Sequence, residues 1–376
     1  MPTIGTQQIK LLERLCNACA VSGDEAEVRL IVLEELKSHT EDVRVDALGN
    51  VLAIKNGAAL KKGGPRLRVM LSAHMDEVGF MLVADDDAGA TGTGASGAGA
   101  TGTGASGAGL FRFETVGGLD LRQLPGKAVL VGRAHVPGVI GARPIHLTTA
   151  EERKQKIPLE ALRIDIGPGA GKVKPGERAT FATRFQRSGP SLLAKALDNR
   201  LGVATLIELV RNAPPEIDLL AAFTVQEEIG LRGAKVAAYA FQPDIGIAVD
   251  ATPANDLPAW DGEENTAYNT KLGLGPAIYV ADGSTLSDPR LVRWLAETGE
   301  AAHIPFQIRQ PGGGGTDAGA IHKARAGVPS VSVSVPHRYS HTAISVARLE
   351  DWKNTLSLLH TALARLTPEL LASARP

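Results

Sequence analysis

The second half of the chain alternates helical patterns with short apolar strands, and no other feature of the sequence limits the fold as strongly. The expected strands are 219–225, 245–249, 305–309 and 330–335, and the expected helices are 192–210, 233–240, 289–302, 316–326 and 349–366. Strands that alternate with helices become parallel neighbours in one sheet. The pattern therefore predicts an α/β fold in which a mostly parallel sheet carries helices on both faces.

The start of the chain is expected to join the same sheet. Helical patterns cover most of 7–39, strands 43–47 and 51–55 form a hairpin, and strand 67–73 runs into a histidine. By contrast, the stretch 110–184 contains short β-like runs with Gly and Pro and no long helical pattern, which indicates a small β domain. We predict a discontinuous main domain of residues 1–76 and 190–376, with an inserted β domain at residues 77–189.

A tandem duplication lies inside the predicted insertion. Residues 90–99 read ATGTGASGAG, and residues 100–109 repeat these letters without change. A segment of Ala, Gly, Thr and Ser cannot bury enough apolar surface to order itself. We therefore predict a disordered loop over residues 88–109, to which we can assign no chemistry.

Composition excludes several classes of partner. Forty Lys and Arg against forty-one Asp and Glu leave a formal net charge of -1, so the chain has no basic footprint for nucleic acid or an anionic membrane. The first residues lack the features of a signal peptide, and no apolar run approaches the roughly 18 residues of a membrane-spanning helix. We expect a soluble, cytoplasmic protein whose partners are small or peptide-like.

Side chains of the kind that bind metals follow the predicted strands, and open α/β sheets bind ligands at the carboxyl ends of their strands. Residues i and i+2 share a face at a strand end, so His74 can bind a metal while Asp76 fixes the imidazole tautomer. Asp198 begins a predicted helix, where it can bind a metal or merely cap the helix.

Two adjacent glutamates, Glu227 and Glu228, leave the next buried strand. Two adjacent charges at the buried end of a strand are costly unless a group of opposite charge neutralises them. The side chains of consecutive residues also point in different directions. One glutamate can therefore bind a metal while the other acts as a general base. Asp250 ends a further strand, and His341 follows the last one, although His337 could take its place. Such imidazoles and carboxylates could form a pair of metal sites that share one carboxylate, with zinc, cobalt or manganese as suitable ions.

The motifs as a set resemble the tetrahedral aminopeptidases, a family of dinuclear-metal exopeptidases that includes the glutamyl aminopeptidases. The resemblance covers nearly the whole chain. Its motifs are SAHMDEVGFM at 72–81, VIGARPIHL at 139–147, KALDNRLGV at 195–203, TVQEEIGLRGA at 224–234, AVDATPA at 248–254, GGTDAGAIH at 314–322 and HRYSHT at 337–342.

The resemblance implies a ligand set for two divalent metal ions per subunit, with zinc or cobalt ahead of manganese. His74 and His341 would each bind one ion, and Asp198 would bridge the two. Glu228 and Asp250 would each complete one coordination sphere.

It also implies an activity and an assembly. With Glu227 as the general base and Asp76 orienting the first histidine, the larger domain would be catalytic and would hydrolyse the first peptide bond of peptides with a free amino terminus. In the family the inserted domain serves dimer contacts, and dimers commonly build a tetrahedral dodecamer, so we expect a homo-oligomer. The duplicated tract departs from the family, which has a short turn there, and it could obstruct assembly.

Other functions use similar residues. A related dinuclear deacylase, dipeptidase or carboxypeptidase would place its extra domain after the carboxylate that follows the paired glutamates, whereas here the β-rich stretch lies between His74 and Asp198. A glycosidase is disfavoured because adjacent Glu227 and Glu228 can hardly flank one glycosidic bond at about 5 to 9.5 Å separation.

An inactive scaffold or binding protein is a further alternative of another class. The preferred first residue of the substrate also stays open. Basic side chains near the motifs that could select an acidic residue are Arg200, Arg232, Lys271 and Arg338.

Overall fold

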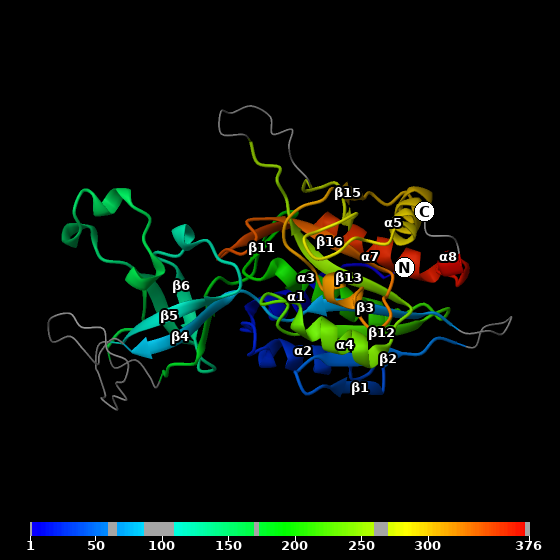
Figure 1. The fold of residues 1–376 in the computed structure, drawn as a ribbon, viewed down its shortest axis with the longest axis horizontal. Coiled ribbons are helices and arrows are strands. Elements are labelled where there is room, and N and C mark those ends of the chain that lie inside the picture. The colour runs from blue at the N-terminus through cyan, green and yellow to red at the C-terminus, as the bar shows by residue number, and fades with distance from the viewer. Residues whose placement is uncertain (1, 59–65, 86–108, 169–172, 259–269, 373–376) are drawn as a thin grey trace. The chain divides into compact units, whose positions relative to one another are not determined.

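A computed structural model describes residues 2–58, 66–85, 109–168, 173–258 and 270–372 (Figure 1). The chain separates into two compact units. The first comprises Met1–Glu77, Arg184–Ser340 and Ile344–Pro376, and the second comprises Val78–Thr183 with His341–Ala343. Within the described ranges, no helix combines the length and the apolar character that crossing a membrane requires.

The first unit is built on an 11-stranded sheet among the described residues. Its strands are β1 (Asp42–Val45), β2 (Val51–Lys55), β3 (Arg68–His74), β10 (Gln186–Ser188), β11 (Ser191–Ala194), β12 (Asp218–Thr224), β13 (Ile245–Pro253), β14 (Ala277–Tyr279), β15 (Gln307–Arg309), β16 (Ser330–Arg338) and β17 (Ser345–Arg348). Its helices are α1 (Thr6–Asn17), α2 (Ala26–Leu36), α3 (Leu197–Arg211), α4 (Arg232–Phe241), α5 (Pro289–Ala302), α6 (Ala318–Ile321), α7 (Leu349–Ala364) and α8 (Glu369–Ala372).

The strand order is β1-β2-β12-β3-β13-β16-β17-β11-β10, with β14 pairing with β15 and β16. The four central strands β12, β3, β13 and β16 are parallel, and the pairs towards the edges are antiparallel apart from β14 with β15. Thr224 pairs with His74 and Pro253 pairs with His337, so the carboxyl ends of the central strands lie at one edge. The predicted, mostly parallel sheet is confirmed.

Helices cover both faces of this sheet because successive strand residues point to opposite sides. Leu71 and Ala221 belong to the core that includes residues of α1, α3 and α7. Their neighbours Met70 and Leu220 belong to a separate core with α4 and Ile321 of α6. The strands are apolar on both faces, as buried parallel strands require.

The second unit contains a closed antiparallel barrel in the order β4-β5-β8-β7-β6-β9. The strands are β4 (Gly79–Asp85), β5 (Leu110–Val116), β6 (Ala128–Val131), β7 (Val136–Gly141), β8 (Arg163–Asp165) and β9 (Arg178–Phe181). Short 3-10 turns occur at Leu121–Gln123, Ile145–Leu147, Glu152–Lys154 and Leu159–Ala161. The ring of Phe80 packs edge-on against Phe113 and Phe181, with centroids 5.2 and 5.3 Å away, and these aromatics anchor the barrel core. The expected inserted β domain is thus confirmed as a barrel, whereas the duplicated tract, apart from Gly109, lies outside the described residues.

Two expected helices differ from the structure. Ser191–Ala194 is the strand β11, because its alternating buried residues pair with β10 and β17, and the helix begins only at Leu197. The expected helix 316–326 is reduced to α6, because Arg325 and Gly327 adopt positive φ angles of 53° and 98° and turn the chain towards β16.

Candidate metal centre

The sheet register brings the candidate ligands to one place. His74 ends β3, and Ala248 of β13 pairs with Ser72, so Asp250 comes level with His74. Asp198 stands at the start of α3, where its peptide bond with Asn199 is cis. The buried Asn199 side chain donates to the carbonyl of Val249 at 2.8 Å, which fixes this turn against β13.

His74 stands between two carboxylates. Its Nε2 atom lies 3.2 Å from Oδ1 of Asp198 and 3.4 Å from Oδ1 of Asp250. One ligand atom from each of these residues lies within 4.8 Å of the others. His74 and Asp250 are buried and Asp198 is half-buried. An imidazole with two carboxylates is a donor set that suits zinc, cobalt or manganese.

Asp198 also belongs to a second group of ligand-type side chains. With Glu228 and His341 it again offers atoms that all lie within 4.8 Å of one another. Asp198 is therefore the residue that the two groups share. His341 stands in the left-handed region at φ 55°, as does nearby Tyr339 at φ 62°.

Asp76 connects the histidine to the paired glutamates. The Nδ1 atom of His74 lies 3.2 Å from the carbonyl oxygen and 3.5 Å from Oδ1 of Asp76. The same carboxylate accepts the backbone N–H groups of Glu227 and Glu228 at 3.0 and 3.2 Å, and the hydroxyl of Ser22 at 2.6 Å. Asp76 thus holds the glutamate loop as well as the imidazole. The sequence motif indicated only the second of these contacts.

The glutamate loop has a further support that sequence reasoning missed. Asn50, which precedes β2, accepts the N–H of Val225 at 3.0 Å and donates to the carbonyl of Gly233 at 3.2 Å. A Cβ atom at Gly233 would lie 2.5 Å from the carbonyl oxygen of Val225, so only glycine fits there. The sequence around Asn50 indicated only a hairpin turn.

The carboxylates change one another's proton affinity. Burial raises the pKa of Glu227 well above its usual value, and Asp250 and Glu228 add to this effect while His74 opposes it. Burial alone would lower the pKa of His74, but Glu227 and the contacts with Asp198 and Asp250 raise it well above its usual value. The site therefore concentrates negative charge that favours cations.

A further buried carboxyl group, which interacts electrostatically with His74 and Asp250, was not singled out in the sequence. Asp317, which precedes α6, is buried and accepts the hydroxyl of Thr224 at 2.6 Å. Burial raises the pKa of Asp317 to about 6, although this hydrogen bond lowers it.

The structure gathers every residue that the sequence proposed for the site, through the ligand groups or through Asp76 and its neighbours. They are His74, Asp76, Asp198, Glu227, Glu228, Asp250 and His341. Their roles stay predictions. Among the described residues, the ligand groups contain His341 and not His337.

Two of the basic candidates for substrate selection have other contacts. Arg200 is fully buried and binds main-chain carbonyl groups, so it cannot line a substrate pocket. Arg338 forms a two-pronged ion pair with Asp256 at 2.7 and 2.9 Å.

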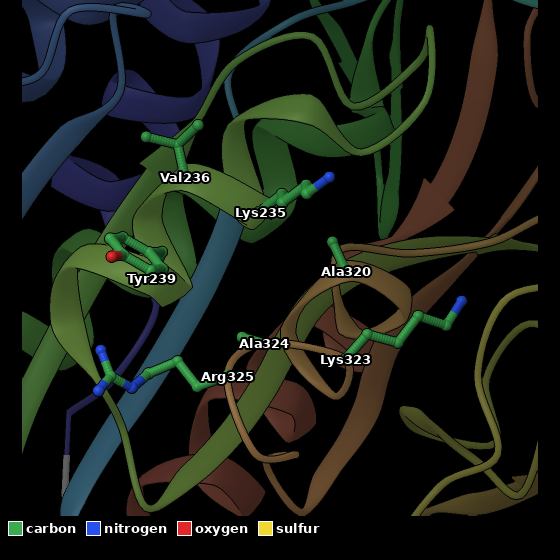
Figure 2. Close-up of a pocket in the computed structure, with 7 residues that line it drawn as sticks. All are labelled: Lys235, Val236, Tyr239, Ala320, Lys323, Ala324 and Arg325. Atoms are coloured by element: carbon green, nitrogen blue, oxygen red, sulfur yellow. The ribbon is translucent and has the colours of Figure 1, made fainter.

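A groove of about 640 Å³ lies apart from these residues, between α4 and the segment around α6 (Figure 2). It is lined by Lys235, Val236, Tyr239, Ala320, Lys323, Ala324 and Arg325. The guanidinium of Arg325 stands 5.7 Å from the ring centre of Tyr239. None of the candidate ligands lines this groove.

Comparison with known proteins gives matches along nearly the whole chain. Residues 99–358 match the profile of a family described as M42 glutamyl aminopeptidase. The lysyl aminopeptidase of Pyrococcus furiosus is 30% identical over 372 residues, which are 96% of this chain and 97% of that protein.

Solved structures of aminopeptidases are also similar to this chain over nearly its whole length. The aminopeptidase APDkam598 from the archaeon Desulfurococcus kamchatkensis is 30% identical, with a TM-score of 0.85 and 98% of each chain covered. The TET1 peptidase of Pyrococcus horikoshii, described as able to assemble into a tetrahedron or a large octahedral shell, is 31% identical. Its TM-score is 0.77, and the match covers 96% of this chain and 100% of that one.

Proposed function

The chain belongs to the M42 glutamyl aminopeptidase family, and on this basis we propose that it is a metal-dependent aminopeptidase that hydrolyses the N-terminal peptide bond of peptides. The observation that carries the proposal is the pair of ligand-type groups that share Asp198. A shared carboxylate between two groups of donors is the arrangement that a dinuclear centre needs.

We assign the ligands of two divalent ions from these groups. His74 and Asp250 would hold one ion, Glu228 and His341 the other, and Asp198 both. When bound, the ions would lower the pKa of water and polarise the scissile carbonyl group. Zinc and cobalt are the expected ions, and manganese also suits these donors.

Glu227 is the proposed general base. Its buried carboxyl group, which interacts electrostatically with His74 and Asp250, would take a proton from the attacking water and deliver it to the leaving amine. The hydrogen bond that the backbone N–H of Glu227 donates to Asp76 holds this residue near His74. The carboxylates also attract the positively charged α-amino group of a peptide, which would restrict cleavage to the first bond.

We further propose that the chain forms a homo-oligomer, either a dimer or a tetrahedral dodecamer of dimers. The support is its similarity to the TET1 peptidase, which is described as a tetrahedral or octahedral assembly. Sedimentation velocity of the metal-loaded protein would separate a dimer from a dodecamer, and a monomer would contradict the proposal.

The activity is tested with a mixed peptide library, half of it N-acetylated, and protein reloaded with cobalt or zinc. Mass spectrometry of the products should show stepwise loss of residues from free amino termini only, and it would reveal the preferred first residue. Equal cleavage of blocked peptides, or cleavage from the carboxyl end, would favour the deacylase or carboxypeptidase alternative. No cleavage by metal-loaded protein would favour a scaffold.

A further inference from the structure

Three charged side chains are buried together behind the candidate centre. Glu77 and Lys195 are each 2% exposed and Arg200 is 0% exposed. The Nζ atom of Lys195 lies 2.8 Å from both carboxylate oxygens of Glu77, and Nη2 of Arg200 lies 3.1 Å from Oε1. None of these three residues is among the proposed metal ligands or the proposed general base.

The trio joins two segments that carry proposed ligands. Glu77 follows His74 by three positions, whereas Lys195 and Arg200 stand on either side of Asp198. The ion pairs therefore span the same two segments as the contact of 3.2 Å between His74 and Asp198. A change in these ion pairs would shift one ligand relative to the other.

The remaining donors of the trio bind the main chain. Arg200 donates to the carbonyl of Met75 and, at 3.2 Å, to that of Asp76, so it holds the turn that follows His74. Lys195 donates to the carbonyl of Ala18 at 2.7 Å, just beyond α1. Arg200 thus holds the turn directly, and Lys195 joins Glu77 to the segment that follows α1.

Stability alone is a poor explanation for three buried charges. Removing charges from water is costly, and replacing a buried ion pair by apolar groups of similar volume is often neutral or stabilising. What apolar side chains cannot do is fix polar atoms at set distances and directions. Arg200, held by Glu77, does so for the carbonyl group of Asp76, which lies 3.2 Å from Nδ1 of His74.

We propose that Glu77, Lys195 and Arg200 form an ionic clamp that sets the position of His74 relative to Asp198 and thereby the affinity of the centre for metal. They are positioning residues that act through the ligands. The inference rests on the proposed dinuclear centre, and its test must separate the two.

The test removes one ion pair of the clamp while keeping its volume. In the double variant Glu77→Gln with Lys195→Met, the amide oxygen can still accept from Arg200, and no unpaired carboxylate is left buried. The matched control is Asp288→Asn with Arg290→Met. It removes an ion pair of 2.9 Å whose Asp288 precedes α5 and accepts the backbone N–H of Arg290 at 3.0 Å.

Each metal-free protein is titrated with Co²⁺, followed by visible absorption, and its thermal unfolding is recorded without metal. We expect the double variant to fold, to bind at least one Co²⁺ about tenfold more weakly and to show an altered cobalt spectrum. Its kcat should fall while its KM stays near the wild-type value, and the control should match the wild type in cobalt affinity and spectrum.

Wild-type affinity and spectrum in a folded double variant would overturn the clamp and leave the metal centre standing. A wild-type protein that binds no Co²⁺ would overturn both. If the double variant does not fold, the cobalt titration is made on the single variant Lys195→Met, which keeps the ion pair between Glu77 and Arg200. Unchanged cobalt affinity in that single variant would also overturn the proposal.

Discussion

One carboxylate, that of Asp76, organises both kinds of residue in the proposed centre. It lies beside the imidazole of His74 and accepts the backbone of Glu227 and Glu228. Burial alone would raise the pKa of Asp76, but the contacts with His74, Ser22 and the Glu227 backbone lower it, so it stays ionised. Its charge is needed for its acceptor role.

Asp76→Asn should therefore impair catalysis more than folding. The amide nitrogen cannot accept an N–H group, so one bond to the glutamate loop is lost. We expect kcat to fall about 10- to 100-fold, as for other residues that orient metal ligands. Ser22→Ala is the control, because it removes a single bond to the same carboxylate and should cost about 1 kcal/mol of stability with a smaller loss of kcat. Steady-state kinetics and urea unfolding check both, and equal kcat in the two variants would contradict this role.

Glu227→Gln tests the proposed general base. The amide keeps the shape of the side chain but cannot take a proton from water, so turnover should be abolished. Metal content should stay near two ions per chain, because Glu227 is not among the ligand-type groups of the described residues. Glu228→Gln is the comparison and should lose bound metal. Kinetics with elemental analysis measures both, and substantial residual turnover would remove Glu227 from this role.

At the scale of elements, the position of Asp198 depends on how closely α3 approaches β13. Gly202 makes this approach possible, because a Cβ atom there would lie 2.5 Å from the carbonyl oxygen of Val249 and 2.2 Å from Oδ1 of Asn199. Asn199 in turn binds the same carbonyl group.

Gly202→Ala should consequently destabilise the protein, although alanine is usually better than glycine in a helix by about 1 kcal/mol. The added methyl group must push α3 away from β13, at a cost of about 1 to 3 kcal/mol, and activity should fall with the shift of Asp198. Gly313→Ala is the matched control, since no atom lies within 4 Å of a Cβ placed there. Urea unfolding and steady-state kinetics compare the two variants. Equal stability of Gly202→Ala and Gly313→Ala would contradict the inferred close approach of α3 to β13.

Lowering the pH should weaken the ionic clamp, because Glu77 becomes protonated. Burial alone would raise the pKa of Glu77, but Lys195 and Arg200 lower it below the usual value of 4.5. Because the folded pKa is the lower one, Glu77 stabilises the fold above about pH 4.5, and this contribution is lost as the pH falls through the lowered pKa. The difference in unfolding free energy between wild type and Glu77→Gln should be constant from pH 7 to 5 and narrow below it. Urea unfolding of metal-free protein at each pH measures this difference, and a gap that widened in acid would contradict the assigned charges.

The sequence predicted those parts of the molecule that follow from local patterns. Buried strands such as β3 and β12 are continuous apolar runs, and the candidate ligands follow them directly. The strand β11 was mistaken for helix because its short pattern depends on pairing with distant β17. Contacts such as that between Asn50 and Val225 could not be predicted, since they join residues far apart in the chain.

At the scale of the whole molecule, the proposed centre exists only when the fold is complete. Its ligands extend from His74 to His341, and the barrel strands occupy the chain between His74 and Asp198. An unfolded chain cannot bring these side chains together, so metal should bind the folded state far better than the unfolded state.

Removing metal should therefore lower the stability of the entire protein. The carboxylates of Asp198, Asp250 and Glu228 repel one another without a cation, and a ligand at 100 times its Kd adds about 2.7 kcal/mol to the folded state. We expect chelation to lower Tm by several degrees and added zinc or cobalt to restore it. Asp198→Asn should lose most of this gain because Asp198 belongs to both ligand groups, whereas Asp288→Asn should keep it. Calorimetry of the wild type and the two variants, each metal-free and metal-loaded, decides, and an equal rise in Tm for Asp198→Asn would place the metal elsewhere.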